Sequence, residues 1–258
     1  MKKAMMYLLL ALGITLVVIF IGGAMLGLIA GFIDGFYGKE VGTTTSMSVM
    51  VYAGSASILL LCIILNWVFL KLGIASYTVG RSPKLVRWKV YVCMAIAFSG
   101  IALLSCVIPD SNSGVAQALQ AYPWMRSNPL YSIVLIALIE ATANLVLYGA
   151  VLREILEWKH NPNVVINVFA AIMGLFSCVT THPSFAPIGF MIAALEGWTY
   201  EYSRSVIPIV IGDVAYWIVM LCFMGTTLSA WWLIVVVILM VPGYIALKML
   251  EPTKPIDY

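Results

Sequence analysis

Residues 131–158, YSIVLIALIEATANLVLYGAVLREILEW, are apolar enough to cross a bilayer, yet Glu140 and Asn144 lie near the centre of this stretch. A carboxyl group at that depth costs at least ~2.5 kcal/mol on insertion scales unless a partner or water receives it. Glu140, Asn144 and Tyr148 are spaced i, i+4 and i+8, so a helix places all three on one face. We therefore expect this face to point toward other helices, with the rest of the chain arranged around it.

The composition and the apolar runs indicate a membrane protein. Of the 258 residues, 63% are hydrophobic and 10% are charged, whereas soluble domains carry about 25% charged residues. Apolar runs of about 20 residues, the length that crosses a bilayer, predict eight transmembrane helices. They lie at about 4–33, 47–72, 87–108, 130–156, 163–181, 186–203, 205–224 and 229–249. Because no internal repeat or low-complexity linker interrupts them, we expect residues 1–258 to form a single all-α, polytopic membrane domain.

The basic residues predict the orientation of the chain. The first apolar run follows two lysines, as in a signal peptide, but it continues to Ile33 without a clear small-x-small cleavage site, so we expect a retained first helix. A cytoplasmic N-terminus leaves only Lys39 and Arg126 outside. The basic residues then inside are Lys2, Lys3, Lys71, Arg81, Lys84, Arg87, Lys89, Arg153, Lys159, Arg204, Lys248 and Lys254. Positive charge favours the cytoplasmic side. We expect an integral protein of the plasma membrane, the inner membrane in a bacterium, with both termini cytoplasmic.

The sequence lacks the motifs that are typical of several classes of chemistry. The five cysteines lie inside apolar segments without metal-ligand spacing, and there is no HExxH motif, phosphate loop or Gly-x-Ser-x-Gly elbow. We therefore expect no metal and no cofactor, and we disfavour serine hydrolysis and ATP-driven transport. The net charge of +3 does not indicate nucleic-acid binding, because basic residues of membrane proteins mainly set orientation. Membrane lipids are the expected partners.

Four ionisable residues are expected at or near membrane depth, where an isolated charge is costly and a functional role is the default hypothesis. They are Glu140, His182, Glu196 and Asp213. Each also has a structural explanation. Glu140 can hydrogen-bond Asn144 and neighbouring hydroxyls, and Asp213 can hydrogen-bond across the bundle. His182 can be a helix-end histidine before a proline, and Glu196 an interfacial or paired charge. Convergence of Glu140, His182 and Asp213 would instead suit general acid/base hydrolysis, or a metal site that no ligand spacing supports.

Residues 147–217 resemble the CPBP family, the CAAX proteases and bacteriocin-processing enzymes also called Abi. LYGAVLR at 147–153 is similar to the end of the family's EExxxR-G motif, and His182 matches the histidine of its FxxxH motif. GWTY at 197–200, followed by SVIP at 205–208, is similar to the family's GWxY and SLWP stretch at the same spacing. The resemblance implies the fold of an eight-helix intramembrane protease.

Most catalytic positions of the family carry other residues in this chain. Alignment on Gly149 gives Ala143 and Asn144 for the paired glutamates, Tyr148 for the arginine, Asp213 for the second histidine and Trp217 for its asparagine partner. Only His182 keeps the family's residue. In the family the glutamate activates water and the histidines stabilise the reacting carbonyl, so the resemblance implies a degenerate catalytic site.

Two acidic residues are candidates to replace the catalytic groups of the family that this chain lacks. Glu140 lies one helical turn before Asn144 on the same face, which would displace the carboxylate by about 6 Å. Asp213, at the position of the second histidine, can act as an acid. Asn144, Tyr148 and Trp217 are expected to line the substrate cavity.

Three functions follow as expectations. The resemblance favours a catalytically degenerate CPBP relative, a pseudoenzyme that binds a membrane-embedded peptide or a lipid-modified protein segment. The first alternative is an active glutamate-type endopeptidase with Glu140, His182 and Asp213 as catalytic residues. The second alternative is a small-solute or proton-coupled transporter, which also places acids at the midplane. The lack of repeats and of paired broken helices disfavours the transporter.

Overall fold

Helices are the regular elements in the residues that the computed structural model describes, which are 2–36, 44–73, 88–108, 128–159, 161–180, 182–223, 226 and 228–250. In chain order they are α1 (Lys2–Phe36), α2 (Thr44–Lys71), α3 (Trp88–Val107), α6 (Pro129–Asn144), η2 (Leu145–Leu152), α7 (Arg153–Lys159), α8 (Pro162–Thr180), η3 (Pro183–Phe185), α9 (Ala186–Ser203), α10 (Ile207–Cys222) and α11 (Trp232–Leu250). The predicted all-α class is confirmed, and each of the predicted apolar segments overlaps a helix.

Six helical segments are long and apolar enough to cross a membrane. They are Lys2–Gly22, Gly54–Lys71, Trp88–Val107, Pro129–Lys159, Pro162–Val179 and Trp232–Leu250. α10 is apolar but shorter, and α9 carries Glu196 and Glu201 within its length. These long apolar helices are consistent with an integral membrane protein, while the count of eight spans stays a prediction. Several residues used for the predicted orientation lie outside the described ranges: Lys39, Arg81, Lys84, Arg87, Arg126 and Lys254.

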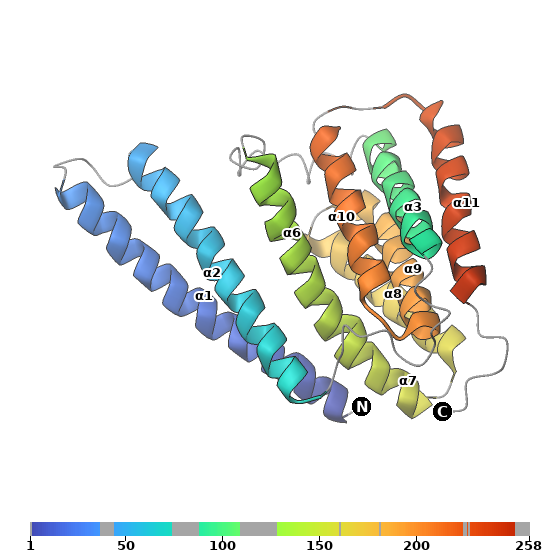
Figure 1. Ribbon diagram of the computed structural model, residues 1–258, viewed down its shortest axis with the longest axis horizontal. Coiled ribbons are helices and arrows are strands. Elements are labelled where there is room, and N and C mark those ends of the chain that lie inside the picture. Colours follow the sequence, from blue (N-terminus) through green and yellow to red (C-terminus); the bar gives the residue numbers. More distant parts are fainter. Residues whose placement is uncertain are drawn as a thin grey trace.

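α6 lies between two groups of helices (Figure 1). α1 and α2 pair on one side of it, and α3, α10 and α11 stand on the other. The hydroxyl of Tyr131 in α6 donates to Ser55 Oγ in α2 at 2.8 Å, and Asn66 Nδ2 in α2 donates to Thr142 Oγ1 in α6 at 2.6 Å. Both bonds join residues 76 apart in sequence, so α2 and α6 run parallel to each other.

α3 forms the centre of the second group. Met94, Phe98 and Ile101 are each 0% exposed, as expected for a helix that is apolar on every side and surrounded by others. Glycines bring its neighbours close: a Cβ on Gly243 of α11 would lie 2.8 Å from the Cβ of Ala97. Small residues at a helix crossing let the backbones approach, which increases van der Waals contact between apolar helices.

A stretch of π-helix follows α6 without a break in the helical rod. η2 hydrogen-bonds over a wider turn than an α-helix does, and seven of its eight residues, Leu145, Val146, Tyr148, Gly149, Ala150, Val151 and Leu152, are buried. The wider turn changes the direction in which the following side chains project. The sequence pattern predicted a regular helix at 130–156, so η2 is a difference from that expectation.

A tight turn sets α10 against α9. Arg204, which ends α9, has a φ of 52°, in the left-handed region. Its guanidinium pairs with Glu201 Oε2 at 3.0 Å. Ser203 Oγ accepts the amide of Ser205 at 3.1 Å and donates to the carbonyl of Ser205 at 3.0 Å. This turn brings the polar residues of α9 and α10 side by side.

Candidate functional site

Three helices bring acidic side chains together inside the bundle. Trp217 of α10 donates its indole N–H to Glu140 Oε1 of α6 at 2.6 Å. Both side chains are half-buried. Among the described residues, the other oxygen of Glu140, Oε2, receives no hydrogen bond. Glu140 is therefore the accessible end of the acidic cluster.

The amide of Asn144 joins the same two helices one turn deeper. Its Nδ2 donates to Asp213 Oδ2 at 2.6 Å, and the two residues are 3% and 6% exposed. This contact is the hydrogen bond across the bundle that the sequence offered as the structural explanation of Asp213. Glu140 does not use Asn144 as its partner, contrary to the structural explanation that the sequence offered for Glu140, because Asn144 reaches the acid on α10 instead.

Tyr148 connects the network to α9. Its hydroxyl donates to Glu196 Oε2, and both side chains are buried. Its ring packs edge-on against Phe169 of α8, with 5.5 Å between the ring centroids. Tyr148 lies in η2, where the wider turn directs it toward α9 while Asn144 faces α10.

The carboxyls of Glu196 and Asp213 lie close to each other between α9 and α10. Each of them has a neutral donor as its partner, Glu196 the hydroxyl of Tyr148 and Asp213 the amide of Asn144. We refer below to Glu140, Asn144, Tyr148, Glu196, Asp213 and Trp217 as the polar network.

The sequence assigned Glu196 incorrectly. It was expected to be an interfacial or paired charge, but it is 7% exposed and lies within the network. The charged pair lies further along the helix, between Glu201 and Arg204. The signal that would have found Glu196 is its position on a helical face with Ala193 and Tyr200, three residues before it and four after it, which are both buried.

His182 has a different set of contacts. It precedes η3 and caps it, accepting the amide of Ser184 on Nδ1 at 3.3 Å. The same Nδ1 lies 2.7 Å from the hydroxyl of Ser184. Among the described residues, His182 makes no hydrogen bond to Glu140 or Asp213. The structure thus brings Glu140 and Asp213 into one network and leaves His182 out of it, because Pro183 starts a new helix that uses the imidazole as its cap.

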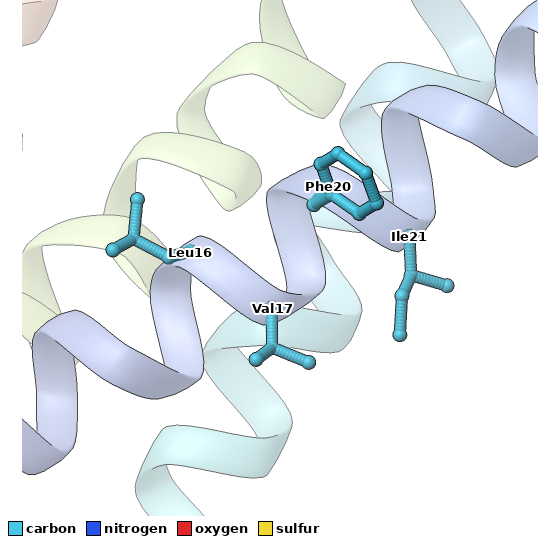
Figure 2. Close-up of a pocket in the computed structure, with 4 residues that line it drawn as sticks. All are labelled: Leu16, Val17, Phe20 and Ile21. Carbon is cyan, nitrogen blue, oxygen red and sulfur yellow. The ribbon is translucent and has the colours of Figure 1, made fainter.

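The described part of the chain holds no group of three or more His, Cys, Asp or Glu side chains placed to bind a metal ion. A hollow of about 540 Å³ lies on α1, and Figure 2 shows the four side chains that line it, Leu16, Val17, Phe20 and Ile21. All four are apolar and more than half exposed. This surface suits lipid chains and is separate from the polar network.

The polar network can accept a hydrogen bond at Glu140 and fix three helices relative to one another. Comparison with known proteins found no matching family model, no similar curated protein and no similar solved structure. The contacts of the network, together with the sequence, are therefore the basis for a functional proposal.

Proposed function

We propose that this chain is a catalytically degenerate membrane protein of the CPBP type, which binds a membrane-embedded peptide or a lipid-modified segment without cleaving it. The CPBP assignment rests on the resemblance of residues 147–217 and on the helical architecture. The main support for a binding role comes from the hydrogen-bond contacts of the two carboxyl oxygens of Glu140. One of its oxygens is held by Trp217, while the other receives no hydrogen bond from the described residues and can accept an N–H from a ligand.

The contacts of the remaining groups support binding over hydrolysis. Hydrolysis of a peptide needs a base with access to water and a group that stabilises the oxyanion. Asp213 and Glu196 are buried, and they are engaged by Asn144 and by Tyr148 respectively. His182 is engaged by its own turn. These contacts disfavour the active endopeptidase that would use Glu140, His182 and Asp213.

Site-specific photocrosslinking in cells tests the binding proposal. A photoreactive residue replaces Ala137, which is half-buried one turn before Glu140, and the matched control replaces Ile238, which is 62% exposed on α11. We expect a protease-sensitive adduct from position 137 that persists with His182→Ala and is lost with Glu140→Gln. Position 238 should give lipid adducts only. An adduct at 137 that is unchanged by Glu140→Gln would contradict the proposal.

One observation favours a second candidate, a proton-coupled transporter. Glu196 and Asp213 lie close to each other and are both buried in the bundle, and acids at membrane depth commonly serve as proton relays. Asp213→Asn keeps an acceptor for Asn144 but removes this titratable carboxyl. Uptake in proteoliposomes that depends on a proton gradient and is abolished by Asp213→Asn would select the transporter, whereas gradient-independent behaviour excludes it.

A further inference from the structure

We propose that a groove between α7 and α8 binds one anionic phospholipid, with an acyl chain along α8 and the headgroup phosphate at Lys159. The groove has a volume of about 370 Å³ and includes Trp158, Lys159, Val164, Val168, Phe169 and Ile172 in its lining. It is independent of the proposed function. Phe169 separates it from Tyr148, so the groove lies outside the polar network.

The apolar wall of the groove has the position in the membrane and the length that are expected for contact with a lipid chain. Val164, Val168 and Ile172 are spaced four residues apart and are 58%, 53% and 58% exposed. They belong to the candidate span Pro162–Val179, so in a membrane they face hydrocarbon. From Val164 to Ile172 the helix rises about 12 Å, close to the ~15 Å depth of one leaflet. One acyl chain can therefore follow the groove over most of its length.

The end of the groove carries a cation that has no acidic partner in the part of the chain that the structure describes. Lys159 Nζ lies 4.3 Å from the centre of the Trp158 ring, and among the described residues it has no ion pair. By contrast, Arg153 is paired with Glu157 at 2.9 Å and Arg204 with Glu201 at 3.0 Å. Tryptophan and lysine are typical of the membrane interface, where the lipid phosphate lies.

Two further features favour an anionic headgroup over a protein helix as the occupant. The first turn of α8 begins beside Lys159, and the N-terminal end of a helix attracts negative charge. A transmembrane helix of a second copy would cover the apolar wall but leave Lys159 without a counter-charge. An anionic phospholipid satisfies the cation and the apolar wall at once, and such lipids are enriched in the cytoplasmic leaflet.

The test uses full-length protein purified in a neutral detergent. Native mass spectrometry measures binding of palmitoyl-oleoyl phosphatidylglycerol and of the phosphatidylcholine with the same chains. Three variants are compared with the wild type: Lys159→Gln removes the charge, Val168→Trp fills the groove from an exposed position, and Lys71→Gln is the control, an exposed lysine at the end of α2.

We expect Lys159→Gln to weaken phosphatidylglycerol binding about fivefold and phosphatidylcholine binding less, because the choline cation offsets the phosphate charge, while Lys71→Gln changes neither. Val168→Trp should weaken binding of both lipids. Equal loss in Lys71→Gln and Lys159→Gln would overturn the proposal, since the attraction would then be spread over the surface. Undiminished binding in Val168→Trp would also overturn it, as would a change of oligomeric state in Val168→Trp measured by light scattering, which would identify the groove as a protein interface.

Discussion

At the residue scale, the three acids of the polar network have neutral donors as partners. The donors are an indole, an amide and a phenol, from Trp217, Asn144 and Tyr148. A neutral donor satisfies a buried carboxyl without bringing a second charge into the low-dielectric interior, where both charges would have to be desolvated. We therefore expect that removal of a donor or an acceptor lowers the free energy of unfolding, whereas isosteric replacement changes it little.

Replacement of Asp213 tests this directly. Asp213→Ala leaves Asn144 Nδ2 buried without an acceptor, so it should lower the free energy of unfolding by about 1–3 kcal/mol. Asp213→Asn keeps an acceptor oxygen for Asn144 and should stay close to the wild type. Thermal unfolding of the purified protein, followed with a thiol-reactive dye, measures both. Equal losses for the two variants would refute the hydrogen-bond account of this position.

The bond between Tyr148 and Glu196 can be isolated with a double-mutant cycle. Tyr148→Phe keeps the ring packed on Phe169 but removes the donor, and Glu196→Gln changes the acceptor. We expect a coupling energy of about 1 kcal/mol between the two substitutions, obtained from unfolding of the two single variants and the double variant. A coupling energy of zero would mean that the two groups stabilise the fold independently.

At the element scale, the close crossing of α8 and α9 depends on glycine. A Cβ on Gly174 would lie 2.8 Å from the carbonyl oxygen of Ala186, a backbone atom that cannot rotate away. Gly174→Ala should therefore lower the free energy of unfolding by about 1–3 kcal/mol. Gly13→Ala is the matched control, because nothing lies within 4 Å of its added Cβ. It should be neutral or stabilise by up to about 1 kcal/mol, and the same thermal assay compares the two variants.

The sequence predicted the positions of the helices better than their local geometry. Apolar run length located each helix to within a few residues, because a membrane segment must be apolar over a fixed length. The spacing of Glu140, Asn144 and Tyr148 predicted that they face the protein interior, and the structure places them in one network. The pattern of apolar residues does not distinguish the π-helix η2 from an α-helix. The sequence therefore did not predict that Asn144 contacts α10 while Tyr148 contacts α9.

The contacts of two site residues, Glu196 and His182, could not be predicted from the sequence. Glu196 was assigned to the interface because other charges follow it, but its burial depends on how α9 packs against η2 and α10. His182 was correctly expected at the end of a helix before a proline. Its grouping with Glu140 and Asp213 required tertiary contacts that spacing along a chain does not specify, and the structure gives it a capping role instead.

At the scale of the whole molecule, the start of α1 and the end of α11 lie toward the same end of the bundle (Figure 1). The basic residues predict that this end is cytoplasmic. In a bacterial host, green fluorescent protein fused after Tyr258 should be fluorescent, and alkaline phosphatase fused there should be inactive. Phosphatase inserted after Arg126, in an expected outer loop, should be active. The reverse pattern would contradict the orientation and would place Lys159 and its groove in the outer leaflet.

We propose that the bundle holds its acids for binding and does not cleave peptides. The most direct test compares new protein N- and C-termini in membranes from cells with the wild-type chain, with Glu140→Gln, with His182→Ala and with the gene deleted. We expect the same termini in all four, with any phenotype of the deletion shared by Glu140→Gln but not by His182→Ala. Termini that are present with the wild type and absent from the deletion and both variants would establish proteolysis and contradict the claim.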